Sequence, residues 1–371
     1  MPSLESSYHA FGLDIGDRSI KAVDLQYNRL VFGKPRLELS TWNEVRVPDG
    51  VFSPGRVEQA ETAAKLLRAV VRTATPKAIK TRSAVVSLPE TTTFIKTIEI
   101  PKVESERIGD EVIREAAAHI PLAFEEATLD WQLLPPLPGV TAAERQRVIV
   151  AVAPRELVEN FSTALEAAGF TILAVEIEAI AIVRGLLIEI LSQNDEAIAV
   201  LDLGASRSNV IIYDQGTIQL TTSLSFSGDV ATAQIAEWLK VSLVEAEKAK
   251  VSCGLDPARC GNRIRPVVAG ILRDLIEDVR AATLAYRRGN PGGHRVRRIL
   301  LAGGSANTLK IDSYLAQKLL TRVSRGNPLG GLTIPDKFPR ERTASFTTAL
   351  GLARRAARFL PMEASGHMNS V

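Results

Sequence analysis

Two acidic turns with the same residue pattern stand 188 positions apart in the chain. In "GLDIGDRSIKAVDL", Asp14 ends an apolar stretch, Gly16 follows, and apolar residues resume at Ile20. "AVLDLGASRSNVIIYDQG" repeats this order around Asp202 and Gly204. Each stretch predicts a β-hairpin with the motif Asp-apolar-Gly at its tip. The repetition predicts two structurally similar lobes that face each other.

The two turns have the residue types that bind a polyphosphate together with a divalent cation. Gly16 and Gly204 let the backbone approach a ligand closely, and successive N–H groups in a tight turn form a concavity that binds anions. Further hydrogen-bond donors are available on Ser19, Lys21, Ser206 and Asn209. Asp14 and Asp202 would repel phosphate unless a divalent cation lay between them, so the pattern implies Mg2+ that keeps its waters.

Two stretches in the C-terminal half could hold the rest of a nucleotide. "RILLAGGSANTLKIDSYLAQKL" predicts a strand, a turn at Gly303 and Gly304, and an amphipathic helix that starts near Leu309. A glycine pair there lets the backbone lie against a flat ring, with helix N–H groups nearby. "LVEAEKAK" places Glu247 and Lys250 on one face of a helix, where an ordinary surface ion pair is the alternative interpretation.

Composition describes a globular chain of 371 residues with two or three domains or one large bilobed unit. A net charge of +3 is weak grounds for a nucleic-acid partner. The N-terminal ten residues lack the pattern of a secretory signal, and the apolar stretch 171–191 carries four charges, so no membrane span is expected. Cys253 and Cys260 have no third thiol or histidine beside them, so we expect neither a zinc site nor a disulfide, and a reducing cytoplasm fits best.

Periodicity and turn signals predict the order of the elements. Strands are expected at Phe11–Leu13, Ile20–Leu25, Leu37–Val47, Ala84–Leu88, Phe94–Ile100, Thr128–Leu134, Val148–Val152 and Ile172–Ile177, and helices at Val57–Thr73, Ser105–His119 and Pro154–Ala168. The expected domains are a first lobe (1–80 and 154–191), an inserted α+β subdomain (81–153), a second lobe (192–345), a closing helix (346–360) and a flexible tail (361–371).

Taken in order, these motifs resemble the actin-like ATPase superfamily. The resemblance rests on a first phosphate turn at Asp14 to Lys21, a second at Asp202 to Asn209, an adenosine motif at Leu300 to Ser305, and the helix "FTTALGLARRA". "HIPLAFEEATLDWQLL" and "VIVAVAPRELVENFSTALEAAGF" are similar to the small inserted subdomain of the PilM family of type IV pilus assembly proteins and of the FtsA family. The implied fold is α/β, actin-like (ribonuclease H-like) and two-lobed, with that subdomain inserted.

The resemblance also implies a role for each matching residue. Phosphate contacts are assigned to Gly16, Asp17, Arg18, Ser19 and Lys21 in one lobe and to Gly204, Ala205, Ser206, Arg207 and Asn209 in the other. The adenosine contacts are assigned to Gly228, Glu247, Lys250, Gly303, Gly304 and Ser305. Asp14 and Asp202 would hold Mg2+ through water, and Asp14, Glu178 and Asp202 are the expected catalytic residues, with Asp202 as base and Glu178 orienting the attacking water.

The first turn departs from the family pattern at two positions. Asp17 and Arg18 stand where the superfamily usually has small hydroxyl residues. An acidic side chain beside the expected phosphates opposes them, and Arg207 in the second turn partly offsets it with a cation that pairs with phosphate oxygens. We therefore expect ATP binding to be retained and ATP hydrolysis to be slow or absent.

The resemblance implies a scaffold that closes its lobes on ATP and binds the cytoplasmic N-terminal segment of a PilN-like inner-membrane protein. It places the chain in the cytoplasm, peripheral at the inner membrane through that partner. Binding of other pilus motor components and formation of a homo-oligomer are also compatible with the resemblance. One alternative is an FtsA-like polymerising ATPase, although the brief basic and apolar stretch near the C-terminus stops at Pro361, too soon for an amphipathic membrane anchor. The other is a sugar-kinase-type phosphotransferase, although the inserted subdomain stands where a substrate domain would lie.

Overall fold

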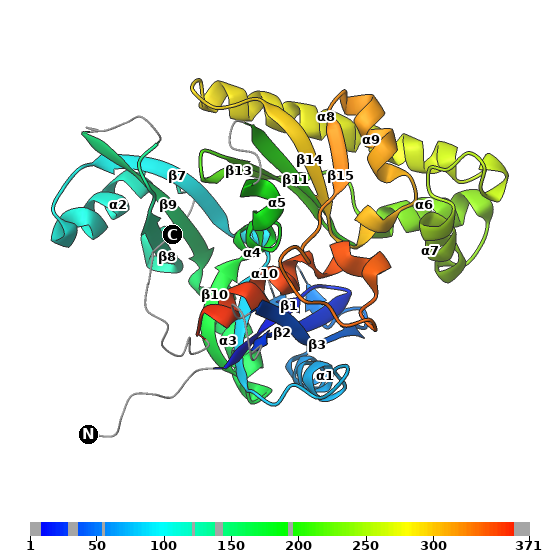
Figure 1. Ribbon diagram of the computed structural model, residues 1–371, viewed down its shortest axis with the longest axis horizontal. Coiled ribbons are helices and arrows are strands. Elements are labelled where there is room, and N and C mark those ends of the chain that lie inside the picture. Colours follow the sequence, from blue (N-terminus) through cyan, green and yellow to red (C-terminus); the bar gives the residue numbers. More distant parts are fainter. Residues whose placement is uncertain are drawn as a thin grey trace.

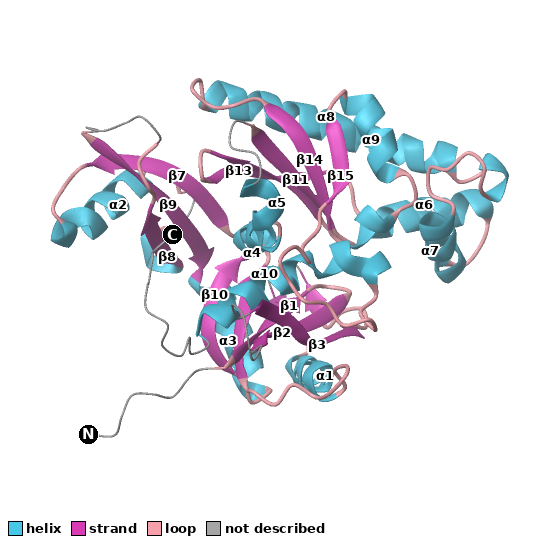
Figure 2. Cartoon of the chain, in the orientation of Figure 1, coloured by secondary structure: helices cyan, strands magenta, loops and turns pink. Residues whose placement is uncertain are grey.

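A computed structural model gives the structure of residues 9–28, 36–53, 56–120, 123–137, 144–191 and 196–359. These ranges form two lobes, each built on a five-stranded sheet, and a third unit with a three-stranded sheet (Figure 1). Helices cover the outer faces of the two large sheets (Figure 2). The expected tail at 361–371 lies outside the described residues.

The sheet of the first lobe has the strand order β10-β6-β1-β2-β3. Its strands are β1 (Ala10–Ile15), β2 (Ser19–Asn28), β3 (Arg36–Arg46), β6 (Ser83–Leu88) and β10 (Thr171–Ile177), and a short hairpin joins β4 (Phe52–Ser53) to β5 (Arg56–Val57). The helices α1 (Ala60–Arg72) and α3 (Arg155–Ala167) pack their apolar faces on this sheet. The pairing of β1 with β2 sets Asp14 opposite Lys21.

The second lobe repeats this arrangement with the order β13-β12-β11-β14-β15. Its elements are β11 (Ala197–Leu203), β12 (Ser208–Asp214), β13 (Thr217–Leu224), β14 (Val296–Ala302) and β15 (Arg322–Arg325), with α6 (Gly228–Leu239), α7 (Leu243–Ser252), α8 (Arg265–Gly289) and α9 (Ile311–Leu319). Asp202 lies opposite Asn209, which matches the register of Asp14 and Lys21 in the first lobe. The expected repeat of hairpins is therefore present in both lobes.

The inserted subdomain has the strand order β7-β9-β8 and one helix. Its elements are β7 (Phe94–Pro101), α2 (Ile108–Ala116), β8 (Ala127–Leu133) and β9 (Arg145–Pro154). Val112 on α2 packs against an apolar cluster from all three strands. The predicted boundary at residue 81 is wrong for the strand that follows it: Ser83–Leu88 pairs in parallel with β1 and β10 and belongs to the sheet of the first lobe.

Two helices cross between the lobes, α4 (Glu178–Gly185) and α10 (Thr347–Ala356) (Figure 1). A Cβ atom on Gly351 would lie 1.7 Å from the carbonyl oxygen of Ala181, and one on Gly185 would lie 2.6 Å from that of Thr347. A Cβ on Gly12 of β1 would lie 2.3 Å from the backbone nitrogen of Ala353. Glycine is thus required where α10 touches α4 and β1. The short helix α5 (Leu187–Leu191) follows α4.

The structure corrects the expectation for the cysteines. Cys253 and Cys260 form a disulfide, with their Cα atoms 5.9 Å apart. Positive φ angles at Gly254, Cys260 and Gly261 fold the loop after α7 back on itself, and sequence spacing does not reveal such a reversal.

The remaining short elements are 3-10 turns. They are η1 (Glu90–Thr92), η2 (Ser105–Arg107), η3 (Phe124–Glu126), η4 (Cys260–Asn262), η5 (Gly304–Asn307), η6 (Arg340–Phe346) and η7 (Ala357–Phe359). The helix expected from Leu309 begins at Ile311 instead. In the described part of the chain, no helix combines the length and the apolar character needed to cross a bilayer.

Candidate functional site

Asp14 and Asp202 lie near the ends of β1 and β11 and are both buried. Burial raises the pKa of Asp14, and Lys21, whose Nζ lies 3.6 Å from Oδ2 of Asp14, opposes that rise. Burial and the charge of Asp14 raise the pKa of Asp202 to about 6. The two acids, one from each lobe, therefore act on one another, as the repeated hairpins predicted.

Glu178 is the first residue of α4, the helix that crosses between the lobes. Burial raises its pKa well above the ordinary value, and Asp202 and Asp14 raise it further. A carboxyl group at a helix N-terminus is placed near free backbone N–H groups, which favour its charged form. The three expected catalytic residues are thus brought into one electrostatic group.

A fourth carboxyl group, Glu90, belongs to the same group, and the sequence analysis missed it. Glu90 follows β6 in the turn η1, is 9% exposed, and raises the pKa of Glu178. Burial raises the pKa of Glu90 to about 7, Asp202 adds to the rise, and the hydroxyl of Thr221 opposes it. Glu90 follows the carboxyl end of a parallel strand, where ligands bind in open α/β sheets. That position is the sequence feature that could have identified Glu90 as a site residue.

The two phosphate turns are bonded to each other across the lobes. The carboxylate of Asp17 accepts hydrogen bonds from the hydroxyl of Ser206 and from Nη2 of Arg207, the latter at 3.2 Å. Nε of Arg18 donates to Oδ2 of Asp229 on α6 at 2.8 Å. Because Asp229 and Ser206 lie in the second lobe, these contacts hold the lobes together at the two turns.

The adenosine motif packs directly against the second turn. Oγ of Ser305 donates to the carbonyl oxygen of Gly204 at 3.2 Å, and a Cβ on Gly228 would lie 2.4 Å from that Oγ. Gly303 has φ +82°, and its Cβ would lie 2.7 Å from Oδ1 of Asp202. The glycines expected at this site are therefore needed for close backbone approach. Gly304 opens the turn η5 beside them.

The pair of Glu247 and Lys250 differs from both interpretations of the sequence. Lys250 is buried, and its Nζ donates to the carbonyl oxygen of Gly228 at 2.9 Å and to Oγ1 of Thr232 at 2.8 Å. Oε2 of Glu247 lies 2.7 Å from the same nitrogen. An ammonium group has three donors, so Lys250 supports Gly228 and α6 from within. Half of the Glu247 side chain is exposed, which leaves Glu247 as the member of the pair that could reach a ribose.

The other expected residues lie on the same two turns. Lys21 donates to Oγ of Ser19 at 2.9 Å, and the backbone N–H of Gly16 donates to the carbonyl oxygen of Ser19 at 3.0 Å. The carbonyl oxygen of Ala205 accepts from the N–H of Asp229 at 2.8 Å. Oδ1 of Asn209 is buried and has no hydrogen-bond partner among the described residues.

Comparison with known proteins identifies the family. A family model described as type IV pilus assembly protein PilM matches residues 12–357. The chain belongs to this family. The protein in a solved PilM-PilN type IV pilus biogenesis complex is 25% identical, and the match covers 95% of this chain and 99% of that one with a TM-score of 0.79.

Two more distant relatives are similar in sequence or in fold. Cell division protein FtsA of Neisseria meningitidis serogroup B is 23% identical over 295 residues, which are 73% of this chain and 67% of FtsA. The structure of MreB5 of Spiroplasma citri bound to ADP is 13% identical, covers 92% of this chain and 94% of that one, and has a TM-score of 0.52, which shows likeness of fold. The expected actin-like two-lobed α/β fold is confirmed. Membership of the PilM family favours the pilus assembly scaffold over the FtsA-like polymerising ATPase and the sugar-kinase-type phosphotransferase.

The residues fit a hydrated magnesium ion better than a bare one. Among the described residues, no group of three His, Cys, Asp or Glu side chains converges closely enough to hold a metal ion alone. Mg2+ typically keeps several waters and takes one or two carboxylates together with phosphate oxygens. Both carboxylate oxygens of Glu90 and Oδ1 of Asn209 are buried acceptors that lack a partner of full hydrogen-bond geometry among the described residues, so they could accept from the waters of such an ion.

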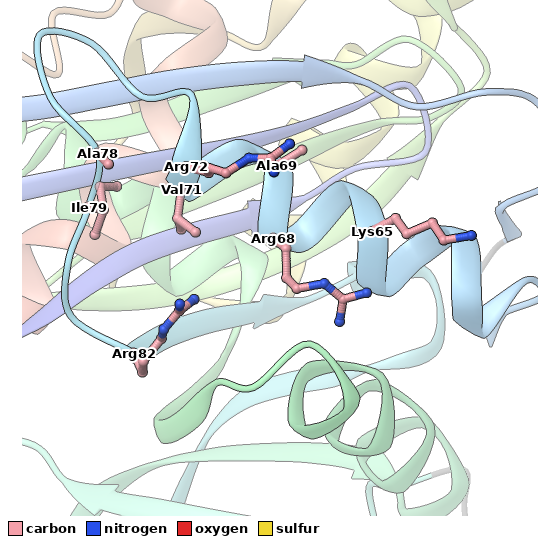
Figure 3. Close-up of a pocket in the computed structure, with 8 residues that line it drawn as sticks. All are labelled: Lys65, Arg68, Ala69, Val71, Arg72, Ala78, Ile79 and Arg82. Carbon is pink, nitrogen blue, oxygen red and sulfur yellow. The ribbon is translucent and has the colours of Figure 1, made fainter.

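A separate cavity of about 380 Å³ lies on the first lobe beside α1 (Figure 3). It is lined by four basic residues, Lys65, Arg68, Arg72 and Arg82, and by Ala69, Val71, Ala78 and Ile79. None of the residues expected to bind nucleotide lines it. The candidate site is therefore distinct from this basic cavity.

Proposed function

We propose that the chain is an ATP-binding scaffold of the type IV pilus assembly machinery. The observation that carries the proposal is the direct contact of the turns of Asp17 and Ser206, which joins the two turns expected to bind phosphate, one from each lobe. Membership of the PilM family supports the pilus role. The solved PilM-PilN complex supports a PilN-like partner, whose cytoplasmic N-terminal segment would bind this chain. Through that partner the chain would attach peripherally to the inner membrane.

The residues of the two turns account for binding of Mg2+-ATP. Backbone N–H groups at Gly16 and Gly204 would face the phosphates, with Lys21 and Arg207 supplying positive charge. Asp14 and Asp202 would hold Mg2+ through its waters, and bound Mg2+ would neutralise phosphate charge. The raised pKa values of Asp202 and Glu178 suit groups that orient a water molecule or accept its proton.

Nucleotide must replace contacts that the lobes already make. The Asp17 carboxylate holds the hydroxyl of Ser206 and the guanidinium of Arg207, two groups expected to bind phosphate. ATP would therefore displace Asp17 from them, and the displaced carboxylate would remain beside the phosphates. This competition lowers affinity and disfavours a tight hydrolytic geometry, in line with the slow or absent ATPase activity that we propose. ATP shifts the lobes only to the extent that it binds one arrangement more tightly.

Calorimetry with Mg2+-ATP and the partner peptide tests this function. Wild-type protein should bind Mg2+-ATP, and the affinity for a peptide that copies the N-terminus of the PilN-like partner should change when Mg2+-ATP is present. Asp14→Ala should weaken nucleotide binding, whereas Asp274→Ala, at an exposed position on α8, should leave it unchanged. Failure of the peptide to bind with or without nucleotide would contradict the scaffold function. Repeated phosphorylation of a sugar would instead support the phosphotransferase.

A further inference from the structure

Glu90 occupies the junction between the first lobe and the inserted subdomain. The strand β6 ends at Leu88 in the sheet of the first lobe, and β7 of the inserted subdomain begins at Phe94. The turn between them is closed by hydrogen bonds from the N–H of Thr93 to the carbonyl oxygen of Glu90 and from Oγ1 of Thr93 to that of Pro89, both 3.2 Å long. A displacement of Glu90 would therefore move the start of β7.

The side chain of Glu90 lacks the partner that a buried carboxylate needs. Both of its oxygens are buried, and neither has a partner of full hydrogen-bond geometry among the described residues, although the hydroxyl of Thr221 lies near enough to lower its pKa. A buried charged group without compensation is costly to the folded state. The groups that act on Glu90 electrostatically are the hydroxyl of Thr221 and the carboxyl of Asp202, and neither supplies a positive charge. The surroundings of Glu90 thus call for a cation or its bound water.

We propose that Glu90 accepts a hydrogen bond from a water of the hydrated Mg2+ ion and so couples occupancy of the cation site to the inserted subdomain. This inference rests on the proposed function, because the cation is the one that accompanies ATP. Contact through water follows from the absence, among the described side chains, of a three-acid group able to hold a metal directly. Asp14, Asp202 and Glu178 lie on the two lobes and the crossing helix, whereas Glu90 adjoins the inserted subdomain.

Manganese binding to the full chain tests the assignment. Mn2+ is titrated in the presence of ADP and followed by electron paramagnetic resonance, with wild type, Glu90→Gln and Glu106→Gln compared. Glu90→Gln keeps the shape of the side chain and should weaken Mn2+ binding roughly tenfold or more, as loss of an outer partner of a metal site does. Glu106→Gln removes the same charge from an exposed position in η2 and should bind like wild type.

Thermal unfolding without metal separates a cation site from a structural role. Above pH 7, where the Glu90 side chain is ionised in spite of its raised pKa, Glu90→Gln removes a buried charge, so in EDTA its melting temperature should equal or exceed that of wild type. Saturating Mg2+-ADP should then raise the melting temperature of wild type more than that of Glu90→Gln. A variant that melts below wild type in EDTA, or fails to fold, would show that Glu90 supports the structure and would overturn the assignment.

Hydrogen exchange reports the coupling itself. In wild type, Mg2+-ADP should slow amide exchange in β7 more than ADP with EDTA does, and Glu90→Gln should lose that difference. Equal Mn2+ affinity in wild type and Glu90→Gln, or equal protection of β7, overturns the role of Glu90 while the proposed function stands. No binding of Mn2+-ADP to wild type overturns both.

Discussion

At the scale of single residues, the candidate site is a set of buried carboxyl groups that are costly to ionise. Burial is the first cause of the raised pKa of Asp14, Glu90, Glu178 and Asp202. Their mutual repulsion adds to it for three of them, Glu90, Glu178 and Asp202. Since a folded state that binds protons more tightly than the unfolded chain loses stability as pH rises, the metal-free protein should be destabilised by these groups near neutral pH.

The variant Asp202→Asn makes this effect measurable. The pKa of Asp202 is about 6 in the folded protein against an ordinary 3.8, so the wild type loses stability relative to the variant as pH rises from about 4 through 6. In EDTA at pH 7.5, Asp202→Asn should be more stable by on the order of 3 kcal/mol, because the pKa rises from 3.8 to about 6 and one pKa unit corresponds to about 1.4 kcal/mol. Urea unfolding at several pH values between 4.5 and 7.5 measures the difference.

The exposed Asp274→Asn serves as the control for Asp202→Asn and should show no such trend with pH. Adding Mg2+-ADP should shrink or reverse the advantage of Asp202→Asn, since the cation compensates the charge that the variant lacks. A stability difference that stays constant across the pH range would contradict the raised pKa of Asp202.

Sequence reasoning found the residues of this site that belong to a repeated pattern. Asp14 and Asp202 are visible because the same hairpin occurs twice, and the structure pairs both hairpins in the same register. Glu90 has no counterpart in the repeat, and its neighbour Thr221 lies on β13, which is distant in sequence. The burial of Lys250 similarly depends on Gly228 and Thr232 of the preceding helix, which helical spacing alone does not reveal.

At the scale of elements, the crossing of α4 and α10 joins the lobes through backbone contact. Gly351 and Gly185 allow the helices to touch at a distance that no side chain permits. Glu178 begins α4, so the crossing also fixes the position of one acid of the site. Such a contact transmits strain because a close-packed interior has no room to absorb an added methyl group.

Gly351→Ala should therefore destabilise the protein. The new Cβ would overlap the carbonyl oxygen of Ala181, and overpacking of this kind typically costs about 1 to 3 kcal/mol. The matched control is Gly270→Ala in α8, where nothing lies within 4 Å of the added Cβ. The control should gain stability by roughly 0.5 to 1 kcal/mol from better helix propensity. Equal unfolding midpoints in urea for the two variants would contradict the close crossing.

Local sequence signals predicted most elements but not every partner. The strand at Ser83–Leu88 was predicted as a strand, yet its assignment to the inserted unit was wrong because parallel pairing with β1 and β10 joins segments far apart in sequence. Alternation of apolar residues shows that a strand is buried without showing which sheet buries it. The disulfide of Cys253 and Cys260 depends on a reversal of the chain that local sequence signals likewise do not show.

At the scale of the whole molecule, the inserted subdomain is attached to both lobes. It continues from the first lobe through Glu90 and reaches the second through β7 and β9. Oγ1 of Thr97 donates to the carbonyl oxygen of Ile218 at 3.0 Å, and the guanidinium of Arg147 donates to that of Gln215 at 3.2 Å. A change in the angle between the lobes must therefore move the inserted subdomain or break these bonds, which gives nucleotide a physical route to a partner bound there.

Thr97→Val tests this route because it removes the hydroxyl that bonds to Thr217 and Ile218 of the second lobe while nearly preserving shape. In wild type, Mg2+-ATP should change the affinity of the PilN-like peptide, and in Thr97→Val that change should shrink while ATP affinity stays the same. Thr163→Val is the control, since the hydroxyl of Thr163 bonds only within α3, to the carbonyl oxygen of Glu159. Calorimetric titration of peptide with and without Mg2+-ATP measures all three proteins. If Mg2+-ATP changes the peptide affinity of Thr97→Val as much as that of wild type, the coupling does not pass through the contact of β7 with β13.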